Sequence, residues 1–241
     1  MRRVRFRAPG SDVVRDGILE GGIVRSGAMR VPFEAVSLAA PCVPTKIVCV
    51  GRNYAAHAAE LGNEVPERPL LFLKPPSAVI GHGEAIVLPK SEDVHYEAEL
   101  AVVIGCRCRD VPAARARDVI LGYTCLNDVS DCVAQKWEKS WVRAKAFDTS
   151  APLGPVLVTP DELEEPFHVR LRLNGQQKQD GWTSAFIFAI PDLIEEITSF
   201  MTLEPGDVIA TGTPAGVGRL SRGDVVEVEI EGIGILRNPV E

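Results

Sequence analysis

The chain has 241 residues and a formal net charge of −7 at pH 7, with 33 acidic and 26 basic side chains. This length suits one main domain with a small appendage, and the acidic balance argues against a nucleic-acid partner, because phosphate contacts need concentrated Lys and Arg. No apolar signal core follows the basic start and no run approaches membrane-spanning length, so we expect a cytoplasmic protein without a membrane partner.

Residues 53–61 are predicted to form a short helix. Asn53 is a suitable N-cap, the alanines favour a helix, and Gly62 stands where a helix stops. His57 and Glu60 are three residues apart and therefore share a face. A glutamate beside a histidine can orient the imidazole and raise its basicity, which suits activation of a water molecule. The alternative is a solvated surface pair.

Residues 95–104 are predicted to form a β-strand, because Val, Ile and Leu dominate and Gly105 closes the segment. Alternate side chains share a face, so Glu97 and Glu99 point the same way. Both faces are otherwise largely apolar, as in a strand covered on both sides. Two carboxylates placed there repel each other and are costly to desolvate, and a divalent cation would remove both penalties. An ordinary ion-paired arrangement is the alternative.

Residues 225–231 provide an internal control. Glu227, Glu229 and Glu231 alternate with Val and Ile, but here the acidic face stays acidic throughout. That pattern is typical of a solvated face on an antiparallel strand, so no site is predicted there. The segment 225–238 is predicted to form a hairpin that turns near Gly232.

A third carboxylate, Asp128, follows the short apolar strand predicted at residues 122–126 and stands in a polar turn. A helix N-cap or a simple turn is the alternative interpretation. Three carboxylates without thiolate or imidazole suit a hard cation such as Mg²⁺, Mn²⁺ or Ca²⁺ rather than zinc. Three protein ligands would also leave positions open for a chelating substrate.

Several positions could hold an anion. Lys74 follows the apolar strand 70–73, Lys145 lies in the segment 143–148, and the loop 211–216 can offer backbone N–H groups and a hydroxyl. A single lysine is usually a solvated surface charge. The loop lacks the Gly-Lys-Ser/Thr ending of a phosphate loop.

The remaining pattern predicts a β-rich α+β fold, with few helices and many strands interrupted by Gly and Pro. Further helices are predicted at residues 111–120, 130–138 and 191–201, the last with a core stripe that includes Ile197 and Phe200. His82, His95 and His168 have no comparable partner in sequence. The six cysteines form no C-x-x-C motif, so we expect reduced thiols, with Cys132 a candidate redox-sensitive group near the site.

Taken together, these segments resemble the fumarylacetoacetate hydrolase family from about Lys46 to Val240. The residues that carry the resemblance are, in order, 51–54 with His57 and Glu60, 72–75, 95–100, 122–130, 145–148 and 203–214. The resemblance implies a mixed β-roll or barrel-like catalytic fold over residues 44–241. Residues 1–43 resemble the small N-terminal β-rich segment of many bacterial members, and residues 41–44 would form the joint.

The resemblance also implies roles for individual residues. The metal-ligand positions, normally occupied by Mg²⁺ or Mn²⁺, correspond to Glu97, Glu99 and Asp128. The water-activating pair corresponds to His57 and Glu60, and the lysine that stabilises an oxyanion to Lys145. Substrate-contacting positions correspond to Arg52, Lys74 and Thr213. One departure is that relatives usually carry Ala-Arg-Asp where this chain has Asp131, Cys132 and Val133, so the usual substrate profile does not carry over directly.

The implied activity is divalent-metal-dependent hydrolysis of a C–C bond in a 2-oxo acid or 1,3-dicarbonyl substrate of the acylpyruvate or fumarylacetoacetate type, through an enolate that the cation stabilises. Alternatives are an isomerase or decarboxylase of oxo-dienedioates (5-carboxymethyl-2-hydroxymuconate or 2-hydroxyhepta-2,4-diene-1,7-dioate) from aromatic catabolism, or an oxaloacetate decarboxylase. A non-catalytic protein that binds metal and oxo-acids is an alternative of another class. The expected cofactor is Mg²⁺ or Mn²⁺, with Ca²⁺ as a structural substitute. The expected partners are a small oxo-acid and a second copy in a homodimer.

Overall fold

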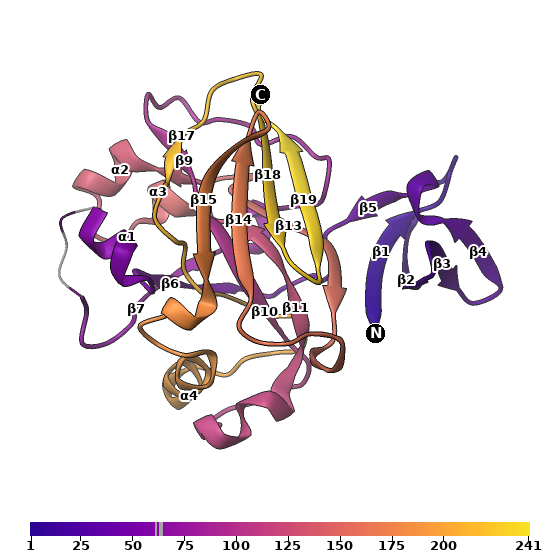
Figure 1. Ribbon diagram of the computed structural model, residues 1–241, viewed down its shortest axis with the longest axis horizontal. Coiled ribbons are helices and arrows are strands. Elements are labelled where there is room, and N and C mark those ends of the chain that lie inside the picture. The colour runs from indigo at the N-terminus through magenta and orange to yellow at the C-terminus, as the bar shows by residue number, and fades with distance from the viewer. Residues whose placement is uncertain (61, 63–64) are drawn as a thin grey trace.

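One large mixed sheet forms the centre of the molecule (Figure 1). The computed structural model describes residues 1–60, 62 and 65–241. The 12-stranded sheet runs in the order β4-β3-β2-β1-β13-β11-β10-β16-β6-β7, with β5 paired to β1 and β8 to β13. Its strands are β1 (Arg2–Arg7), β2 (Val14–Glu20), β3 (Ile23–Ser26), β4 (Met29–Pro32), β5 (Ser37–Ala39), β6 (Ile47–Gly51), β7 (Leu70–Lys74), β8 (Val79–Ile80), β10 (Ala98–Ile104), β11 (Ile120–Asn127), β13 (Ala151–Val158) and β16 (Val208–Ala210).

A four-stranded antiparallel sheet covers one face of the large sheet and closes the main core. It consists of β15 (Gln176–Trp182), β14 (His168–Leu173), β18 (Val225–Ile230) and β19 (Gly234–Pro239), in that order. Leu171 and Val228 belong to the same buried cluster as Leu100 and Val102 of β10. On the opposite face of β10, Ala101 and Val103 join a second buried cluster. The prediction of a strand covered on both sides is therefore confirmed, because every residue of β10 is buried.

A small third sheet and three short helices gather at one side of the large sheet (Figure 1). The small sheet consists of β12 (Ser130–Asp131), β9 (Val94–Tyr96) and β17 (Gly218–Arg219). The α-helices are α1 (Ala55–Glu60), α2 (Cys132–Trp137), α3 (Val142–Lys145) and α4 (Ile190–Phe200). The 3₁₀ turns are η1 (Phe33–Ala35), η2 (Pro76–Ala78), η3 (Ala113–Val119), η4 (Pro160–Glu162) and η5 (Thr183–Ala185).

The predicted β-rich α+β fold is confirmed, and within the described residues the strands form sheets in a linear order rather than a closed barrel. The predicted strand 95–104 is divided at Glu97, where the chain leaves the small sheet in β9 and enters the large sheet in β10. The predicted helix 111–120 is instead the 3₁₀ segment η3. The core stripe on α4 is confirmed for Ile197 but is wrong for Phe200, which is 52% exposed.

The control segment behaves as predicted. The hairpin of β18 and β19 turns at Gly232, whose φ of 83° lies in the left-handed region that favours glycine. Glu227 and Glu229 are partly exposed, and arginines of the neighbouring strands pair with them. The charges of Glu227 and Glu229 are therefore balanced by arginines of the same sheet.

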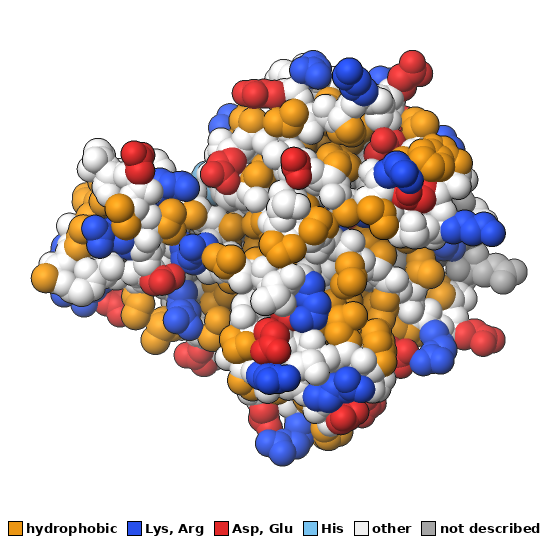
Figure 2. Space-filling view, turned by 180° about the vertical axis from the view of Figure 1, so that it is seen from behind, with side chains coloured by type: hydrophobic (Ala, Val, Ile, Leu, Met, Phe, Trp, Pro, Cys, Tyr) orange, Lys and Arg blue, Asp and Glu red, His pale blue; other side chains and the backbone are white. Residues whose placement is uncertain are grey.

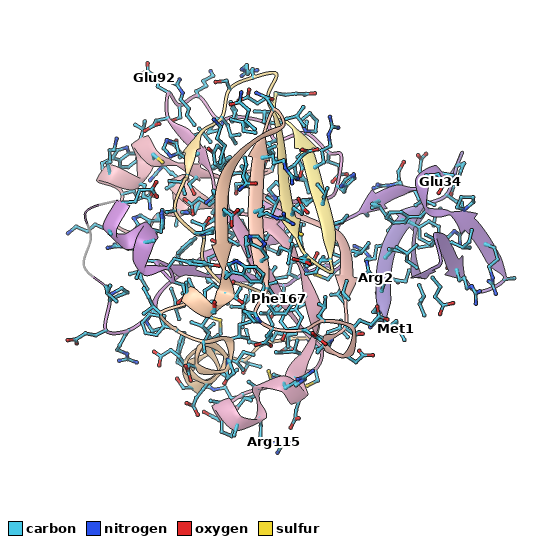
Figure 3. All side chains as sticks on the ribbon, in the orientation of Figure 1. Met1, Arg2, Glu34, Glu92, Arg115 and Phe167 are labelled. Atoms are coloured by element: carbon cyan, nitrogen blue, oxygen red, sulfur yellow. The ribbon has the colours of Figure 1, made fainter. Side chains whose placement is uncertain are left out.

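The N-terminal strands β1–β4 stand apart from the main body in Figure 1, joined to it through the pairing of β1 with β13. Figure 3 places Met1 and Arg2 at the end of β1 beside the main body, where the Met1 amino group pairs with Glu162 and Arg2 donates to the Gly232 carbonyl oxygen. Seen from behind, hydrophobic side chains gather in the middle of the face and charged ones around its rim (Figure 2). The division into residues 1–43 and 44–241 stays a prediction. Of the helices described, none is both long and apolar enough to cross a membrane.

Candidate metal centre and active site

A cavity of about 490 Å³ opens where the small sheet, α1–α3 and the large sheet meet. Its lining residues are Val50, Gly51, Arg52, His57, Phe72, Asp93, His95, Glu97, Glu99, Asp128, Cys132, Gln135, Lys136, Trp141, Lys145, Thr213 and Val217. Seven of the nine residues predicted from the sequence are in this lining. A larger hollow of about 750 Å³ beside β1 and β2 is lined by none of these nine residues.

Glu97, Glu99 and Asp128 converge in this cavity. Each offers a carboxylate oxygen, and the three oxygens lie within 4.8 Å of one another. The pairing of Ala98 with Asn127 brings β10 and β11 together here, and the Asp128 N–H donates to the Glu97 carbonyl oxygen at 2.9 Å. Glu97 and Glu99 thus lie together, as the strand pattern predicted, and Asp128 lies beside them; their role as metal ligands stays a prediction.

The electrostatics of these carboxylates suit a divalent cation. Glu99 is 2% exposed. Burial, followed by the negative charges of Asp128 and Glu97, raises the pKa of Glu99 well above its usual range. A hard cation prefers carboxylate oxygens and would compensate this clustered negative charge. The donor set, its spacing and its burial therefore fit a site for Mg²⁺ or Mn²⁺.

Two lysines hold Asp128 from the sides. Lys145 Nζ lies 2.7 Å from Asp128 Oδ2 and 2.9 Å from Glu97 Oε2. Lys74 is completely buried and donates to Asp128 Oδ1 and to the Val129 carbonyl oxygen. Burial opposes ionisation of Asp128, but the ammonium groups of Lys145 and Lys74 outweigh it and hold the pKa of Asp128 below its usual range. Lys74 therefore lies behind the carboxylates, and a direct substrate contact for it stays a prediction.

His57 and Glu60 form the predicted pair on α1. His57 Nδ1 lies 3.0 Å from Glu60 Oε2, and the Gly216 N–H donates to the same carboxylate at 3.0 Å and 3.2 Å. Because His57 is buried and lines the cavity, the alternative of a solvated surface pair is wrong. The His57 imidazole is instead oriented by the Glu60 carboxylate, which accepts a hydrogen bond from the Gly216 backbone N–H.

Asn53 is not the predicted N-cap of this helix. The helix begins at Ala55, and the buried Asn53 amide donates to the carbonyl oxygens of Phe188 and Thr211 and accepts from the Phe188 N–H. Asn53 does not cap the helix because distant backbone groups form hydrogen bonds with both the nitrogen and the oxygen of its buried side-chain amide. They fix the start of the His57 segment to the end of β16.

The loop 211–216 offers backbone N–H groups, as predicted, but it offers them to side chains of the site. The Gly212 N–H donates to Glu99 Oε2 at 2.8 Å. Gly212 has a φ of 97°, and a Cβ there would approach Asn53 Cβ to 2.7 Å, so only glycine fits. The Thr213 hydroxyl oxygen lines the cavity and accepts from Gln179 Nε2 at 2.8 Å.

A second pair of polar residues in the cavity, Asp93 and His95, was not predicted from the sequence. His95 Nε2 lies 2.7 Å from Asp93 Oδ1, so His95 has a carboxylate partner although the sequence offers it none comparable to the helical pair of His57 and Glu60. Asp93 and His95 are two positions apart at the start of β9, so their side chains point to the same face of the strand. This strand period could have predicted the pair. His168 also has a partner, Asp180, across the β14–β15 hairpin. Burial, with the charges of Glu97 and Asp93, raises the pKa of the nearby Cys132 to about 12.

The chain is similar to known proteins over most of its length. The family model "Fumarylacetoacetate (FAA) hydrolase C-terminal" matches residues 46–241. "Oxaloacetate tautomerase YisK" of Bacillus subtilis is 41% identical over 229 residues, 89% of this chain and 76% of the relative. The structure of 5-carboxymethyl-2-hydroxymuconate delta-isomerase from Mycobacterium smegmatis superposes with a TM-score of 0.92 at 45% identity, covering 100% of this chain and 98% of the other. Maleylpyruvate hydrolase from Sphingobium sp. SYK-6, in complex with manganese(II) and pyruvate, gives a TM-score of 0.85 at 31% identity, with the same coverage.

Proposed function

Because the chain belongs to the fumarylacetoacetate hydrolase family, we propose that it is a divalent-metal-dependent enzyme that interconverts tautomers or isomers of a 2-oxo dicarboxylic acid. The observation that carries the proposal is the meeting of three carboxylates, two of them buried, with a cationic lysine and a carboxylate-bound histidine in one cavity. The named relatives of 41% and 45% identity are a tautomerase and an isomerase. Both reactions move a proton next to a carbonyl group.

The metal would be held by Glu97, Glu99 and Asp128, with Mg²⁺ or Mn²⁺ as the proposed ion. Bound there, the cation lowers the energy of negative charge that develops on the 2-oxo oxygen of the substrate. The manganese in the Sphingobium relative supports a divalent ion in this fold.

The residues of the chain itself would supply the proton transfer. His57 is the proposed base that takes a proton from the carbon next to the 2-oxo group, since its ring lines the cavity. Glu60, fixed by the Gly216 N–H, would keep the imidazole oriented and stabilise its positive charge after the transfer. Lys145 places a fixed positive charge beside the carboxylates, where it would stabilise an oxyanion. Arg52 and Thr213 would bind the oxygens of the substrate.

Hydrolysis of a C–C bond is a second candidate, and the pairing of the buried His57 with Glu60 favours it. The same imidazole would then take a proton from a water molecule that attacks the distal carbonyl carbon, and Lys145 would hold the resulting oxyanion. The Sphingobium relative is a maleylpyruvate hydrolase. A decarboxylase, a non-catalytic oxo-acid binder, and the expected homodimer stay predictions.

The experiment is steady-state turnover of oxaloacetate enol, a 2-hydroxyhepta-2,4-diene-1,7-dioate, acetylpyruvate and fumarylpyruvate, each with Mg²⁺, Mn²⁺ or excess chelator. We expect metal-dependent change of the ultraviolet spectrum without change of substrate mass. Splitting of the mass into two acids would select the hydrolase, and loss of CO₂ the decarboxylase. Turnover that persists at full rate in chelator would refute the metal-dependent mechanism, and tight metal binding without any turnover would select the non-catalytic alternative.

A further inference from the structure

A second group of potential metal ligands shares the cavity with the three carboxylates. Asp93, His95 and Cys132 each offer one ligand atom, and the three atoms lie within 4.8 Å of one another. All three residues line the cavity. None of them belongs to the metal centre or the catalytic pair proposed above, so their convergence needs a separate explanation.

The backbone holds these three residues in place. In the small sheet, His95 pairs with Ser130, and the Cys132 N–H donates to the Asp93 carbonyl oxygen at 2.8 Å. Cys132 is the first residue of α2, whose N-terminus is fixed because Asp131 Oδ1 accepts from the N–H groups of Val133 and Ala134. A cation would therefore meet ligands that are already positioned, which reduces the entropy lost on binding.

The chemistry of this group differs from that of the neighbouring site. A thiolate, an imidazole and a carboxylate form a borderline-soft donor set that suits Zn²⁺, whereas three carboxylates suit Mg²⁺ or Mn²⁺. Asp93 Oδ1 and His95 Nε2 lie 2.7 Å apart, so two of the potential ligand atoms already face each other. Three protein ligands leave a fourth tetrahedral position for water or a substrate oxygen.

We propose that Asp93, His95 and Cys132 form a second cation site, selective for a thiophilic divalent ion such as Zn²⁺. On binding, the Cys132 thiol releases its proton to solvent and the sulfur becomes a metal ligand. The Asp93 and His95 side chains are 34% and 24% exposed, whereas those of Glu97 and Asp128 are 14% and 1% exposed. The second site therefore lies nearer to solvent than the carboxylate centre, at the entrance to the same cavity.

The nearby charges permit a cation in this position. Glu97 and Asp93 both act on Cys132 as negative charges, which disfavour an isolated thiolate but attract a metal ion. Two competing cations are Lys145, whose charge also acts on Cys132, and Lys136, whose Nζ lies 3.8 Å from Asp93 Oδ2 and which is the nearer to Asp93. The Lys136 side chain is 76% exposed, so it can turn into solvent at small cost when a divalent ion enters.

Co²⁺ added to the reduced, full-length protein in a large excess of Mg²⁺ tests the proposal without any activity assay. A cobalt ion bound by Cys132 produces a thiolate-to-cobalt charge-transfer band in the near ultraviolet, whereas cobalt on carboxylates alone does not. We expect this band in the wild type, its loss on addition of Zn²⁺, and its absence in Cys132→Ser. The matched control is Cys106→Ser, which removes an exposed thiol and should keep the band.

Asp93→Asn provides a second variant that does not alter the sulfur. It should weaken Zn²⁺ binding by about 10- to 100-fold, because it replaces a charged carboxylate ligand with a neutral amide. Absence of the band at saturating Co²⁺, its persistence in Cys132→Ser, or its loss in Cys106→Ser would each overturn the proposal. Circular dichroism of each variant identifies a folding defect. If Cys132→Ser does not fold, the Zn²⁺ affinity of Asp93→Asn tests the proposal, and an affinity equal to that of the wild type refutes the site.

Discussion

The ammonium nitrogen of Lys145 lies 2.7 Å from Oδ2 of Asp128. Burial favours the neutral amine, but the carboxylates of Asp128 and Glu97 outweigh burial and raise the pKa of Lys145 above its usual range. Lys145 therefore remains protonated at neutral pH. It is a fixed positive charge rather than a base, which supports the proposal that His57 is the proton acceptor.

Substitution of Lys145 by Gln should separate charge stabilisation from metal binding. We expect kcat/KM to fall by about 10²- to 10³-fold, as for the removal of one donor to a developing oxyanion. Binding of Mg²⁺ should not weaken, because the variant loses a cation that competes for Glu97 and Asp128. Calorimetric titration with Mg²⁺ beside steady-state kinetics measures both quantities. A parallel loss of metal affinity would show that Lys145 mainly holds the carboxylates in place.

Substitution of Glu99 by Gln should weaken Mg²⁺ binding and abolish turnover. The change keeps the size of the side chain but removes one of the three clustered charges, and with it a ligand that a hard cation prefers. The matched control is Glu227→Gln, which neutralises a glutamate of similar strand pattern on β18 and should leave Mg²⁺ affinity unchanged. Wild-type turnover by Glu99→Gln in excess chelator would remove the metal hypothesis.

Substitution of His57 by Ala should preserve Mg²⁺ affinity but slow proton transfer by about 10²- to 10⁴-fold, the usual contribution of a general base. Decarboxylation of oxaloacetate, if the enzyme catalyses it, should be affected less than hydrolysis. His168→Ala is the control, because His168 also contacts a carboxylate but stacks on Trp182 outside the cavity. Equal effects of both substitutions would indicate that His57 has only a structural role.

The carboxylate cluster was predictable because its signal is local. The strand period places Glu97 and Glu99 on one face, and apolar neighbours on both faces indicate burial. The acidic strand with Glu227 and Glu229 lacks that second feature, and the structure shows it paired with arginines instead. Alternation together with apolar flanks therefore distinguished a candidate site from an ordinary surface strand.

Contacts between distant segments were not predictable in the same way. Asn53 binds Phe188 and Thr211 rather than capping its own helix, because residues more than 130 positions away in sequence satisfy its buried amide. Cys132 meets Asp93 only because β12 pairs with β9. These contacts depend on which strands pair, and the sequence pattern of one strand does not specify its partners.

Asp207 is a buried charge immediately before β16, and its removal should lower stability. Its side chain is fully buried and accepts hydrogen bonds from Thr45, Lys46 and Glu204, including the Lys46 ammonium group. Burial opposes ionisation, but the hydrogen bonds from Lys46, Glu204 and Thr45 outweigh it and hold the pKa of Asp207 below its usual value. These contacts join β16 to the residues just before β6.

The Asp207→Asn variant should be less stable than the wild type by about 1–3 kcal/mol at pH 7, because an amide nitrogen then faces donors. Since the folded state lowers this pKa, the carboxylate contributes stability fully above pH about 4 and loses it as the pH falls through the folded-state pKa. Urea unfolding of both proteins from pH 7 to pH 3 should therefore show a difference in unfolding free energy that becomes smaller as the pH falls. Asp161→Asn, at a side chain 78% exposed, should change little at any pH. A difference in unfolding free energy that stays constant down to pH 3 would show that the packing of the Asp207 side chain, not its charge, stabilises the fold.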